Sequence, residues 1–148
     1  MNILLLGSGG RENAIAWAIK KNKKVNTLFI APGNYGTSLL GRNINLDISN
    51  FESIKDFIKK EKINLLIVGP EKPIVDGVFD YLRSVFTLEE LIIIAPSKIG
   101  GALEGSKKFA KEFMKKYKIP NAKYETFKKN KFSEAISYLK NLTPPYVL

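Results

Sequence analysis

A glycine-rich turn lies where the first apolar run of the chain gives way to a helical pattern. Residues 7–13 read Gly-Ser-Gly-Gly-Arg-Glu-Asn and follow the apolar residues 3–6. Glycine permits positive φ and a close approach of the backbone, and the free amides and dipole at a helix start favour an anion. The turn is therefore a candidate site for a phosphate or a carboxylate. The alternative is a tight strand-to-helix turn without a ligand.

Two further glycine-bearing turns follow later strand-like runs. Residues 31–37 read Ala-Pro-Gly-Asn-Tyr-Gly-Thr, and residues 68–73 read Val-Gly-Pro-Glu-Lys-Pro. Because ligands of open parallel sheets gather at the carboxyl ends of the strands, three such loops would line one polar crevice. Glu71 would place a carboxylate there that can bind an amine or a sugar hydroxyl. Each sequence taken singly favours only a turn, but together they favour a site.

The first turn does not fit a dinucleotide-binding site. The pattern G-x-G-x-x-G would place its third glycine at position 12, which is Glu12. An NAD site also needs an acidic residue about 20 positions further on, at the end of the second strand. The next acidic residue after Glu12 is Asp47. Both observations argue against NAD.

A lysine at a later helix start could reach phosphate oxygens as a point charge. Lys107 follows Gly105 and Ser106 where a new helical pattern begins. The spacing alone favours a place on a solvated basic face, together with Lys108 and Lys111. A phosphate contact is the alternative.

The composition limits the chemistry of the chain. It has 148 residues with no Cys and no His, which excludes serine–histidine, cysteine–histidine and zinc chemistry built on these side chains.

The chain is strongly basic: Lys and Arg number 24 against 14 Asp and Glu, a net charge of +10. We interpret this charge as a solvated basic surface that helps to attract anionic substrates, in preference to a nucleic-acid interface. Every apolar run is far shorter than the ~20 residues of a membrane span.

The first hundred residues alternate strand-like and helical patterns, as in a parallel sheet built from βαβ units. We expect a doubly wound, Rossmann-like α/β layer structure. The expected strands are residues 2–6, 25–31, 63–68 and 91–95, and the expected helices are residues 11–21, 51–60 and 74–85. The near-continuous apolar strands indicate that helices cover both faces of the sheet.

The pattern changes after residue 95, where proline and glycine interrupt a short segment. We expect a Rossmann-like domain over residues 1–101 and the start of a second domain over residues 102–148. In the second domain the sequence predicts a helix from Ser106, a short strand over residues 123–127 and a helix beginning near Phe132. The last residues, 146–148, read as the beginning of another strand.

The three turns occur together with two further segments. Residues 95–97 read Ala-Pro-Ser, and residues 103–111 read Leu-Glu-Gly-Ser-Lys-Lys-Phe-Ala-Lys. Over its whole length the chain resembles the amino-terminal part of the phosphoribosylamine–glycine ligases, or glycinamide ribonucleotide synthetases, of the ATP-grasp superfamily. The resemblance implies a Rossmann-like N domain, also called a pre-ATP-grasp domain, followed by an ATP-grasp module. It also implies a role in purine biosynthesis: ATP phosphorylates the glycine carboxylate, and the amine of 5-phosphoribosylamine attacks the acyl phosphate.

The resemblance assigns candidate residues within the chain, although it identifies no catalytic residue and no metal ligand there. Lys107 is similar to the lysine that the superfamily places near the ATP phosphates. At Asn13 the family commonly has His, and Asn forms hydrogen bonds but does not titrate near neutrality. The residues that the resemblance implies for substrate binding are Gly9, Gly10, Arg11, Glu12, Pro32, Gly33, Asn34, Gly69, Pro70 and Glu71.

The resemblance further implies an N-terminal fragment that is inactive alone. In the family, the strand that would begin at residues 146–148 leads into a glycine-rich phosphate loop and later ligands for magnesium or manganese, so ATP and the metal would be held mostly outside this chain. We expect a cytoplasmic protein with small-molecule substrates and without a nucleic-acid or membrane partner. The alternatives are another ATP-grasp carboxylate–amine ligase or a standalone binding module of Rossmann type.

Overall fold

The computed structural model describes residues 1–144 and divides into two compact units, residues 1–107 and residues 108–148. The sheet lies entirely in the first unit. The first compact unit ends at Lys107. The domain boundary expected between residues 101 and 102 stays a prediction. Each unit is described below by itself.

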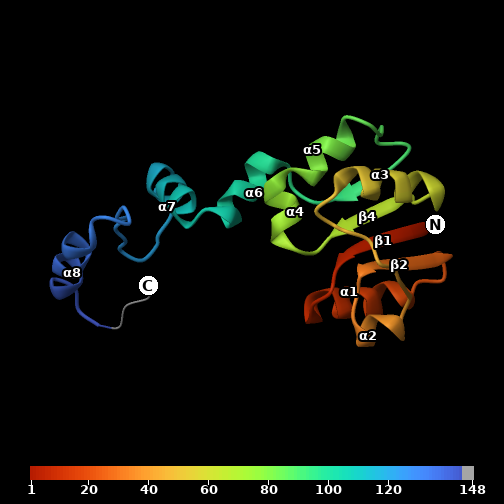
Figure 1. Ribbon diagram of the computed structural model, residues 1–148, viewed down its shortest axis with the longest axis horizontal. Coiled ribbons are helices and arrows are strands. Elements are labelled where there is room, and N and C mark those ends of the chain that lie inside the picture. The colour runs from red at the N-terminus through yellow and green to blue at the C-terminus, as the bar shows by residue number, and fades with distance from the viewer. Residues whose placement is uncertain (145–148) are drawn as a thin grey trace. The chain divides into compact units, whose positions relative to one another are not determined.

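The first unit contains a parallel sheet with the strand order β3-β2-β1-β4-β5 (Figure 1). The bounds of the strands are β1 Asn2–Gly7, β2 Thr27–Pro32, β3 Arg42–Asn43, β4 Leu65–Val68 and β5 Ile92–Ile94. The order reverses at β1, because the chain moves outward to β2 and β3 and then returns to the other side of β1 for β4 and β5. Ligands of doubly wound sheets bind at such a switch point. The expected α/β class and Rossmann-like sheet are confirmed.

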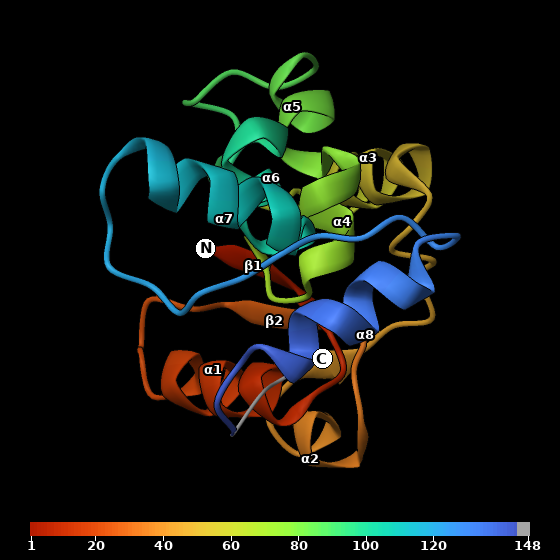
Figure 2. The same ribbon diagram turned by 90° about the vertical axis from the view of Figure 1, so that its left-hand side faces the viewer.

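Helices cover much of the sheet on its two faces, and Figure 2 shows α1 on one side of β1 and β2 and α4 on the other. One core contains Leu4, Leu66 and Phe29 together with residues of α3, α4 and α5, whereas the smaller core joins Ile3 and Leu5 to α1. The helices of this unit are α1 Gly10–Lys20, α2 Tyr35–Ser38, α3 Phe51–Lys60, α4 Glu71–Asp76, α5 Val78–Arg83 and α6 Lys98–Gly105.

The expected helix over residues 74–85 is wrong as a single element. The chain forms α4 and α5 instead, which meet at Gly77 with φ +100°. This left-handed conformation ends a helix and suits glycine. The sequence also failed to predict α2, β3 and α6. Helix α2 has four residues and strand β3 has two, which is too short for a periodic pattern. Helix α6 lies in a glycine-rich segment, where the periodic pattern is weak.

In the second unit, α7 (Lys107–Lys116) begins at the last residue of the first unit and α8 spans Phe132–Lys140. The strand expected over residues 123–127 is wrong, since the segment is irregular. A strand requires a neighbour for its backbone hydrogen bonds, and within residues 1–144 this segment pairs with none. The strand expected at residues 146–148 lies outside the described residues. No helix among residues 1–144 has the length and apolar character needed to cross a bilayer.

A surface network connects α3 to α5 and supplies a pH-dependent prediction. Lys55 and Tyr81 both donate hydrogen bonds to the Glu52 carboxylate, and these bonds hold the pKa of Glu52 below its ordinary value. The ionised Glu52 therefore stabilises the folded protein at pH values above the ordinary pKa of Glu. This stabilisation is lost as the pH falls through the lowered pKa of Glu52 in the folded protein. Tyr81→Phe should raise the Glu52 pKa part of the way back, measured by NMR titration of its carboxyl carbon. Tyr35→Phe is the control and should leave that pKa unchanged.

Candidate functional site

The three glycine-bearing loops come together at the carboxyl edge of the sheet. Gly7 at the end of β1 pairs in register with Pro32 at the end of β2, and the amide of Gly33 donates to the Gly7 carbonyl at 3.1 Å. On the other side of β1, the amide of Gly69 donates to the Leu6 carbonyl at 3.1 Å. The edge of the sheet thus places the three loops side by side, as the turn sequences predicted.

The first loop is organised around the buried carboxylate of Glu12, which is 5% exposed. Its Oε2 accepts a hydrogen bond from the Gly9 amide at 2.7 Å. The side chain also fills the space beside Gly7 and Gly69, where an added Cβ would lie 2.5 Å from Glu12 Cγ and 2.2 Å from Glu12 Oε1, respectively. Glu12 therefore packs between the first and third loops. Contact of this residue with a substrate stays a prediction.

Arg11 is exposed, unlike the buried Glu12, and joins the same two loops. Its Nη1 donates to the carbonyl oxygen of Gly69 at 2.8 Å, across 58 positions of sequence. The guanidinium group has five donors in a fixed fork, so this one bond leaves others for an anion. The exposed residues Gly9 and Gly10 lie at the start of α1, where the first-turn amides have no partner inside the helix.

The second loop is connected to the first by Asn34. Its Nδ2 donates to the Ser8 carbonyl at 2.7 Å, while its Oδ1 accepts from the Thr37 amide at 2.9 Å and so begins α2. Pro32 is exposed and follows Ala31 through a cis peptide bond. Gly33 has φ +76°, a conformation that favours glycine. One amide side chain thus starts a helix and anchors two loops to each other.

The third loop ends at Pro70, the N-cap of α4, and places Glu71 in the first turn of that helix. Gly69 is buried, Pro70 is half-buried and Glu71 is exposed. Within residues 1–144 no hydrogen bond or ion pair engages the Glu71 carboxylate. It is the acidic side chain of this edge that remains available to a ligand, in contrast to the buried Glu12.

Two residues that support the second loop were missed by the sequence reasoning. Thr37 is fully buried, and its hydroxyl bonds to the Asn34 carbonyl and to Oδ1 of Asn43. Asn43 on β3 in turn donates to the Asn34 carbonyl at 2.7 Å. The spacing of Asn34 and Thr37 is that of a helix-capping pair and could have identified Thr37. No local signal identifies Asn43, because its role depends on the position of β3.

Asn13, at the position where the family commonly has His, lies on the first turn of α1. Its Oδ1 is buried and has no hydrogen-bond partner among residues 1–144. An added Cβ at Gly36 would lie 2.7 Å from this oxygen, so the side chain faces α2. The unpaired acceptor is a local cost to stability. The backbone amide of Asn13 donates to the Gly9 carbonyl at 3.1 Å, but its side chain bonds to neither Gly9 nor Asn34.

Lys107 is exposed at the first residue of α7. Among residues 1–144 no hydrogen bond connects it to the three loops, and its assignment to ATP phosphates stays a prediction. The described residues also contain no group of three or more Asp, Glu, His or Cys that could hold a metal ion. The residues present therefore do not form a magnesium site by themselves.

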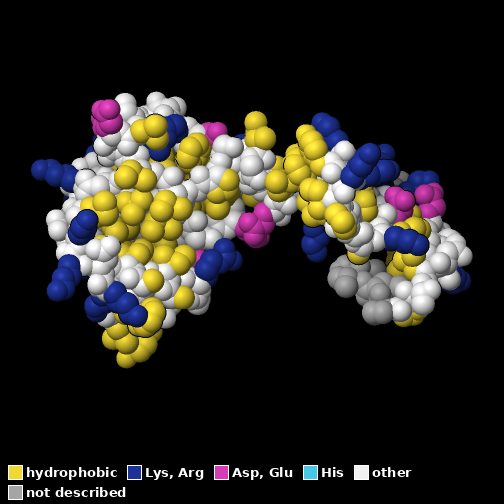
Figure 3. Space-filling view, turned by 180° about the vertical axis from the view of Figure 1, so that it is seen from behind, with side chains coloured by type: hydrophobic (Ala, Val, Ile, Leu, Met, Phe, Trp, Pro, Cys, Tyr) yellow, Lys and Arg dark blue, Asp and Glu magenta, His cyan; other side chains and the backbone are white. Residues whose placement is uncertain are grey.

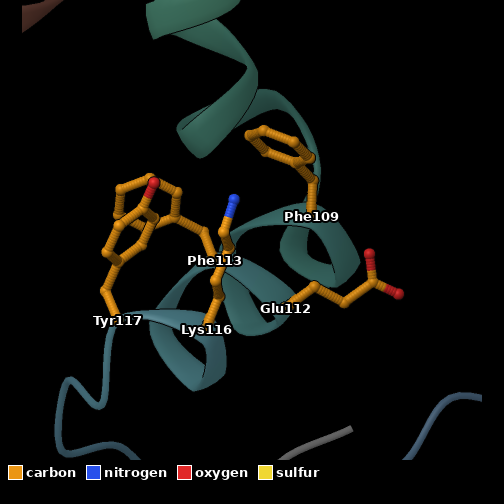
Figure 4. Close-up of a pocket in the computed structure, with 5 residues that line it drawn as sticks. All are labelled: Phe109, Glu112, Phe113, Lys116 and Tyr117. Carbon is orange, nitrogen blue, oxygen red and sulfur yellow. The ribbon is translucent and has the colours of Figure 1, made fainter.

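A hollow of about 340 Å³ lies along one face of α7 and is lined by Phe109, Glu112, Phe113, Lys116 and Tyr117 (Figure 4). The rings of Phe113 and Tyr117 lie 4.5 Å apart between centroids. Four of the five lining residues belong to this helix, and Tyr117 directly follows it. The helix has no buried residue. We interpret the hollow as an apolar helix face that belongs in a domain core, and not as a catalytic site.

Two family models match this chain, one in each of two consecutive parts. Residues 1–104 match the family described as phosphoribosylglycinamide synthetase, N domain, and residues 105–148 match its ATP-grasp (A) domain. The chain belongs to the phosphoribosylglycinamide synthetase family. The resemblance inferred from the turn sequences is thereby confirmed, as is the expected start of an ATP-grasp domain after the Rossmann-like unit.

Relatives in the phosphoribosylglycinamide synthetase family align with the whole of this chain. The phosphoribosylamine–glycine ligase of Clostridium acetobutylicum is 43% identical over 148 residues, and that of Escherichia coli is 40% identical over 150 residues. The alignment covers 100% of this chain and 34% of each relative. The crystal structure of the Thermotoga maritima phosphoribosylamine–glycine ligase superimposes with a TM-score of 0.66 at 29% identity, covering 98% of this chain and 32% of that one. The chain thus spans about a third of the relatives' length.

The double role of Asn34 in this phosphoribosylglycinamide synthetase N domain predicts a two-part effect of Asn34→Ala. Loss of the helix cap and of the bond to Ser8 should lower the free energy of unfolding by about 1 to 2 kcal/mol. If the three loops bind a sugar phosphate, as the turn sequences predict, binding of ribose 5-phosphate, measured by NMR titration, should weaken at least fivefold because two loops lose their connection. Asn50→Ala is a matched control, since Asn50 caps α3 by accepting from the Ser53 amide at 3.0 Å and its hydrogen bonds in the described part of the chain go to Asp47, Ser53 and Ile54 rather than to a site loop. A control that weakened binding as much would contradict the role of Asn34.

Proposed function

We propose that this chain is the N-terminal, substrate-binding part of a ligase that joins glycine to 5-phosphoribosylamine in purine biosynthesis in the cytoplasm. The products are glycinamide ribonucleotide, ADP and phosphate, and the proposed intermediate is glycyl phosphate. The observation that carries the proposal is the meeting of three glycine-bearing loops at the switch point of a family-matched N domain. The ligase names of the relatives support the same reaction.

The chemistry of the loops suits a phosphorylated amino sugar. The amides at the start of α1 and the Arg11 guanidinium favour the phosphate, and the net charge of +10 attracts an anionic substrate. The Glu71 carboxylate can accept hydrogen bonds from a sugar hydroxyl or an amine. In this proposal Gly9, Gly10 and Arg11 bind the phosphate side, and the loops of Asn34 and Glu71 orient the sugar.

This chain contributes positioning to the reaction. Loops that are connected through Arg11, Glu12 and Asn34 keep the amine in one place, and holding two reactants in a fixed geometry accounts for much of the rate of such a step. ATP supplies the phosphoryl group that activates the glycine carboxylate. Lys107 is the residue of this chain that we assign to the ATP phosphates, and we place the magnesium or manganese ligands in the remaining two-thirds of the ligase.

A coupled ADP-release assay tests the proposal. The chain and the ligase at the full length of its relatives are compared with and without glycine and phosphoribosylamine. ADP release only by the longer form, and only with both substrates, is the expected result. Release by the longer form without a requirement for glycine would instead indicate another ATP-grasp ligase. No release by either form would favour a standalone binding module.

Glu71→Gln provides a test at one residue. The substitution keeps the shape of the side chain but removes the charge, so a hydrogen bond to an amine or hydroxyl loses strength. We expect the full-length ligase to bind phosphoribosylamine 5- to 30-fold more weakly, corresponding to about 1 to 2 kcal/mol, measured from the substrate dependence of ADP release. Glu89→Gln is the control, because Glu89 is exposed and lies before the amino end of β5, away from the carboxyl ends of the strands where the three loops meet. Unchanged kinetics of Glu71→Gln would contradict its role.

A further inference from the structure

Asn43 is an exposed residue of β3 whose side chain is bonded to the second site loop. Its Nδ2 donates to the Asn34 carbonyl at 2.7 Å, and its Oδ1 accepts from the Thr37 hydroxyl at 2.8 Å. Strand β3 is two residues long and pairs with β2, where Asn43 is opposite Ile30. The end strand of the sheet thus holds a loop that lies nine positions earlier in the chain.

Three hydrogen bonds form a closed ring around the backbone of Asn34. The Asn34 amide donates to Oγ1 of Thr37 at 2.7 Å, the Thr37 hydroxyl donates to Asn43, and Asn43 donates back to the Asn34 carbonyl. The single proton of the Thr37 hydroxyl also has the Asn34 carbonyl within 2.9 Å. That carbonyl already accepts from Asn43 and from the Ser38 amide, so the proton is needed at Asn43. In the closed ring each proton has its own acceptor.

The side chain of Asn34 is occupied as well. Its Oδ1 accepts from the Thr37 amide at 2.9 Å, and its Nδ2 lies 2.7 Å from the Ser8 carbonyl and 3.4 Å from the Gly9 carbonyl. A side-chain amide has two donor protons, and both therefore have acceptors on the first loop. Asn34 can donate to a substrate only after one of these bonds is broken.

Gly33 leaves the space that Asn43 needs. A Cβ added at Gly33 would overlap the side-chain amide of Asn43, and Gly33 has φ +76°, which strains a residue with a side chain. A larger residue at position 33 would therefore push Asn43 out of the ring. The contacts of the loop itself thus account for the residues at positions 33 and 34, without a bond to the substrate.

The positive charge of the chain does not by itself fix a substrate in place. On the face that Figure 3 shows, Lys and Arg side chains are spread over the first unit and are not gathered at one point. Such a distribution attracts an anion to the molecule but does not define where the anion binds. The geometry of the loops must define the site, and the ring fixes the backbone of one of them.

We propose that Asn43 is a positioning residue for the phosphorylated sugar and acts through Asn34. The ring holds the Asn34 backbone, and the Asn34 side chain then holds the second loop against Ser8 of the first loop. A loop that is already ordered costs less free energy to order when a ligand binds. The proposal rests on the proposed function, because it takes phosphoribosylamine as the ligand of the loops. It assigns a role in binding to a residue outside the three loops.

Substitutions in the full-length ligase test the proposal. Asn43→Ala removes both bonds of Asn43, and Thr37→Val breaks the ring at its other member by replacing the hydroxyl with a methyl group. Asn64→Ala is the matched control, because Asn64 is also exposed and its Oδ1 accepts from the Asn2 amide at 2.8 Å. That bond lies at the amino ends of β1 and β4, away from the loops. Circular dichroism and urea unfolding measure the fold and stability of each variant.

We expect Asn43→Ala to raise the KM for phosphoribosylamine about tenfold, and to raise the Kd of ribose 5-phosphate, measured by calorimetry, by the same factor. The KM values for glycine and ATP should stay within about twofold. Thr37→Val should raise the same two sugar constants. Asn64→Ala should leave all of these constants within about twofold, even where it lowers stability as much as Asn43→Ala does.

Two results with Asn43→Ala would overturn the proposal while the proposed function stands. One is an unchanged KM for phosphoribosylamine, and the other is an equal rise of the KM for all three substrates, which indicates a role in stability alone. Failure of the proposed function has a different signature, because it is seen in the unsubstituted ligase. That ligase would then neither require phosphoribosylamine nor bind ribose 5-phosphate, and both proposals would be overturned.

Discussion

Replacing Gly7 by alanine is expected to lower the free energy of unfolding of the Rossmann-like unit by about 3 kcal/mol. Gly7 has φ +129°, which L side chains rarely adopt, and an added Cβ would lie 2.5 Å from Cγ of the buried Glu12. Backbone strain and overpacking each cost about 1 to 3 kcal/mol. Trp17 on α1 is the one tryptophan of the chain, so its fluorescence during urea unfolding reports on this unit.

Gly10→Ala is the matched control for Gly7→Ala. Gly10 belongs to the same turn, but an added Cβ there meets no atom within 4 Å. Because alanine is also a better helix former than glycine, stability should stay within about 0.5 kcal/mol of the unchanged chain or rise slightly. If both substitutions had equal effects, the tight fit around Glu12 would not be the reason for the glycine at position 7.

Replacing Glu12 by alanine should lower the free energy of unfolding by about 2 to 3 kcal/mol. The substitution removes the acceptor of the Gly9 amide and leaves a cavity between the first and third loops. The loops should then lose their fixed geometry, so ribose 5-phosphate binding, followed by NMR titration, should weaken more than tenfold. Tryptophan fluorescence in urea measures the change in stability.

Glu12→Gln separates the packing of this side chain from its charge. Glutamine fills nearly the same volume and still offers an oxygen to the Gly9 amide, but the bond is no longer charge-assisted and is about half as strong. We expect a loss of about 1 kcal/mol, smaller than for alanine. If glutamine lowered binding as much as alanine while stability was kept, the Glu12 charge would act on the ligand itself, in agreement with the original substrate-binding prediction.

Local patterns were sufficient to predict four of the five strands of the sheet, all except β3, and the helices α1 and α3. Residues 3–6 and 63–68 are nearly continuous apolar runs, which is typical of strands covered on both faces. The helix expected over residues 51–60 has the bounds of α3, because Asn50 caps it and its apolar residues recur with helical spacing. The glycine turns after three of these strands then had to share one edge of a parallel sheet.

Local patterns failed where the conformation depends on a distant residue or where a helical spacing continues across a break. The segment 123–127 has strand-like composition but no neighbouring strand within residues 1–144, and it stays irregular. The break at Gly77 was missed because the apolar residues on either side of it continue a helical spacing. The role of Asn43 was missed because it arises only when β3 lies beside β2.

The sequence by itself determined that this protein has a parallel α/β sheet, three glycine-bearing loops at its carboxyl edge and a place in the phosphoribosylglycinamide synthetase family. Only the tertiary structure decided that Glu12 is buried while Glu71 is exposed, and that Arg11 bonds to Gly69. The physical reason is the separation along the sequence of the residues that interact. Turn and strand preferences arise from neighbouring residues, whereas burial and contacts across 58 positions depend on how the strands are ordered and registered.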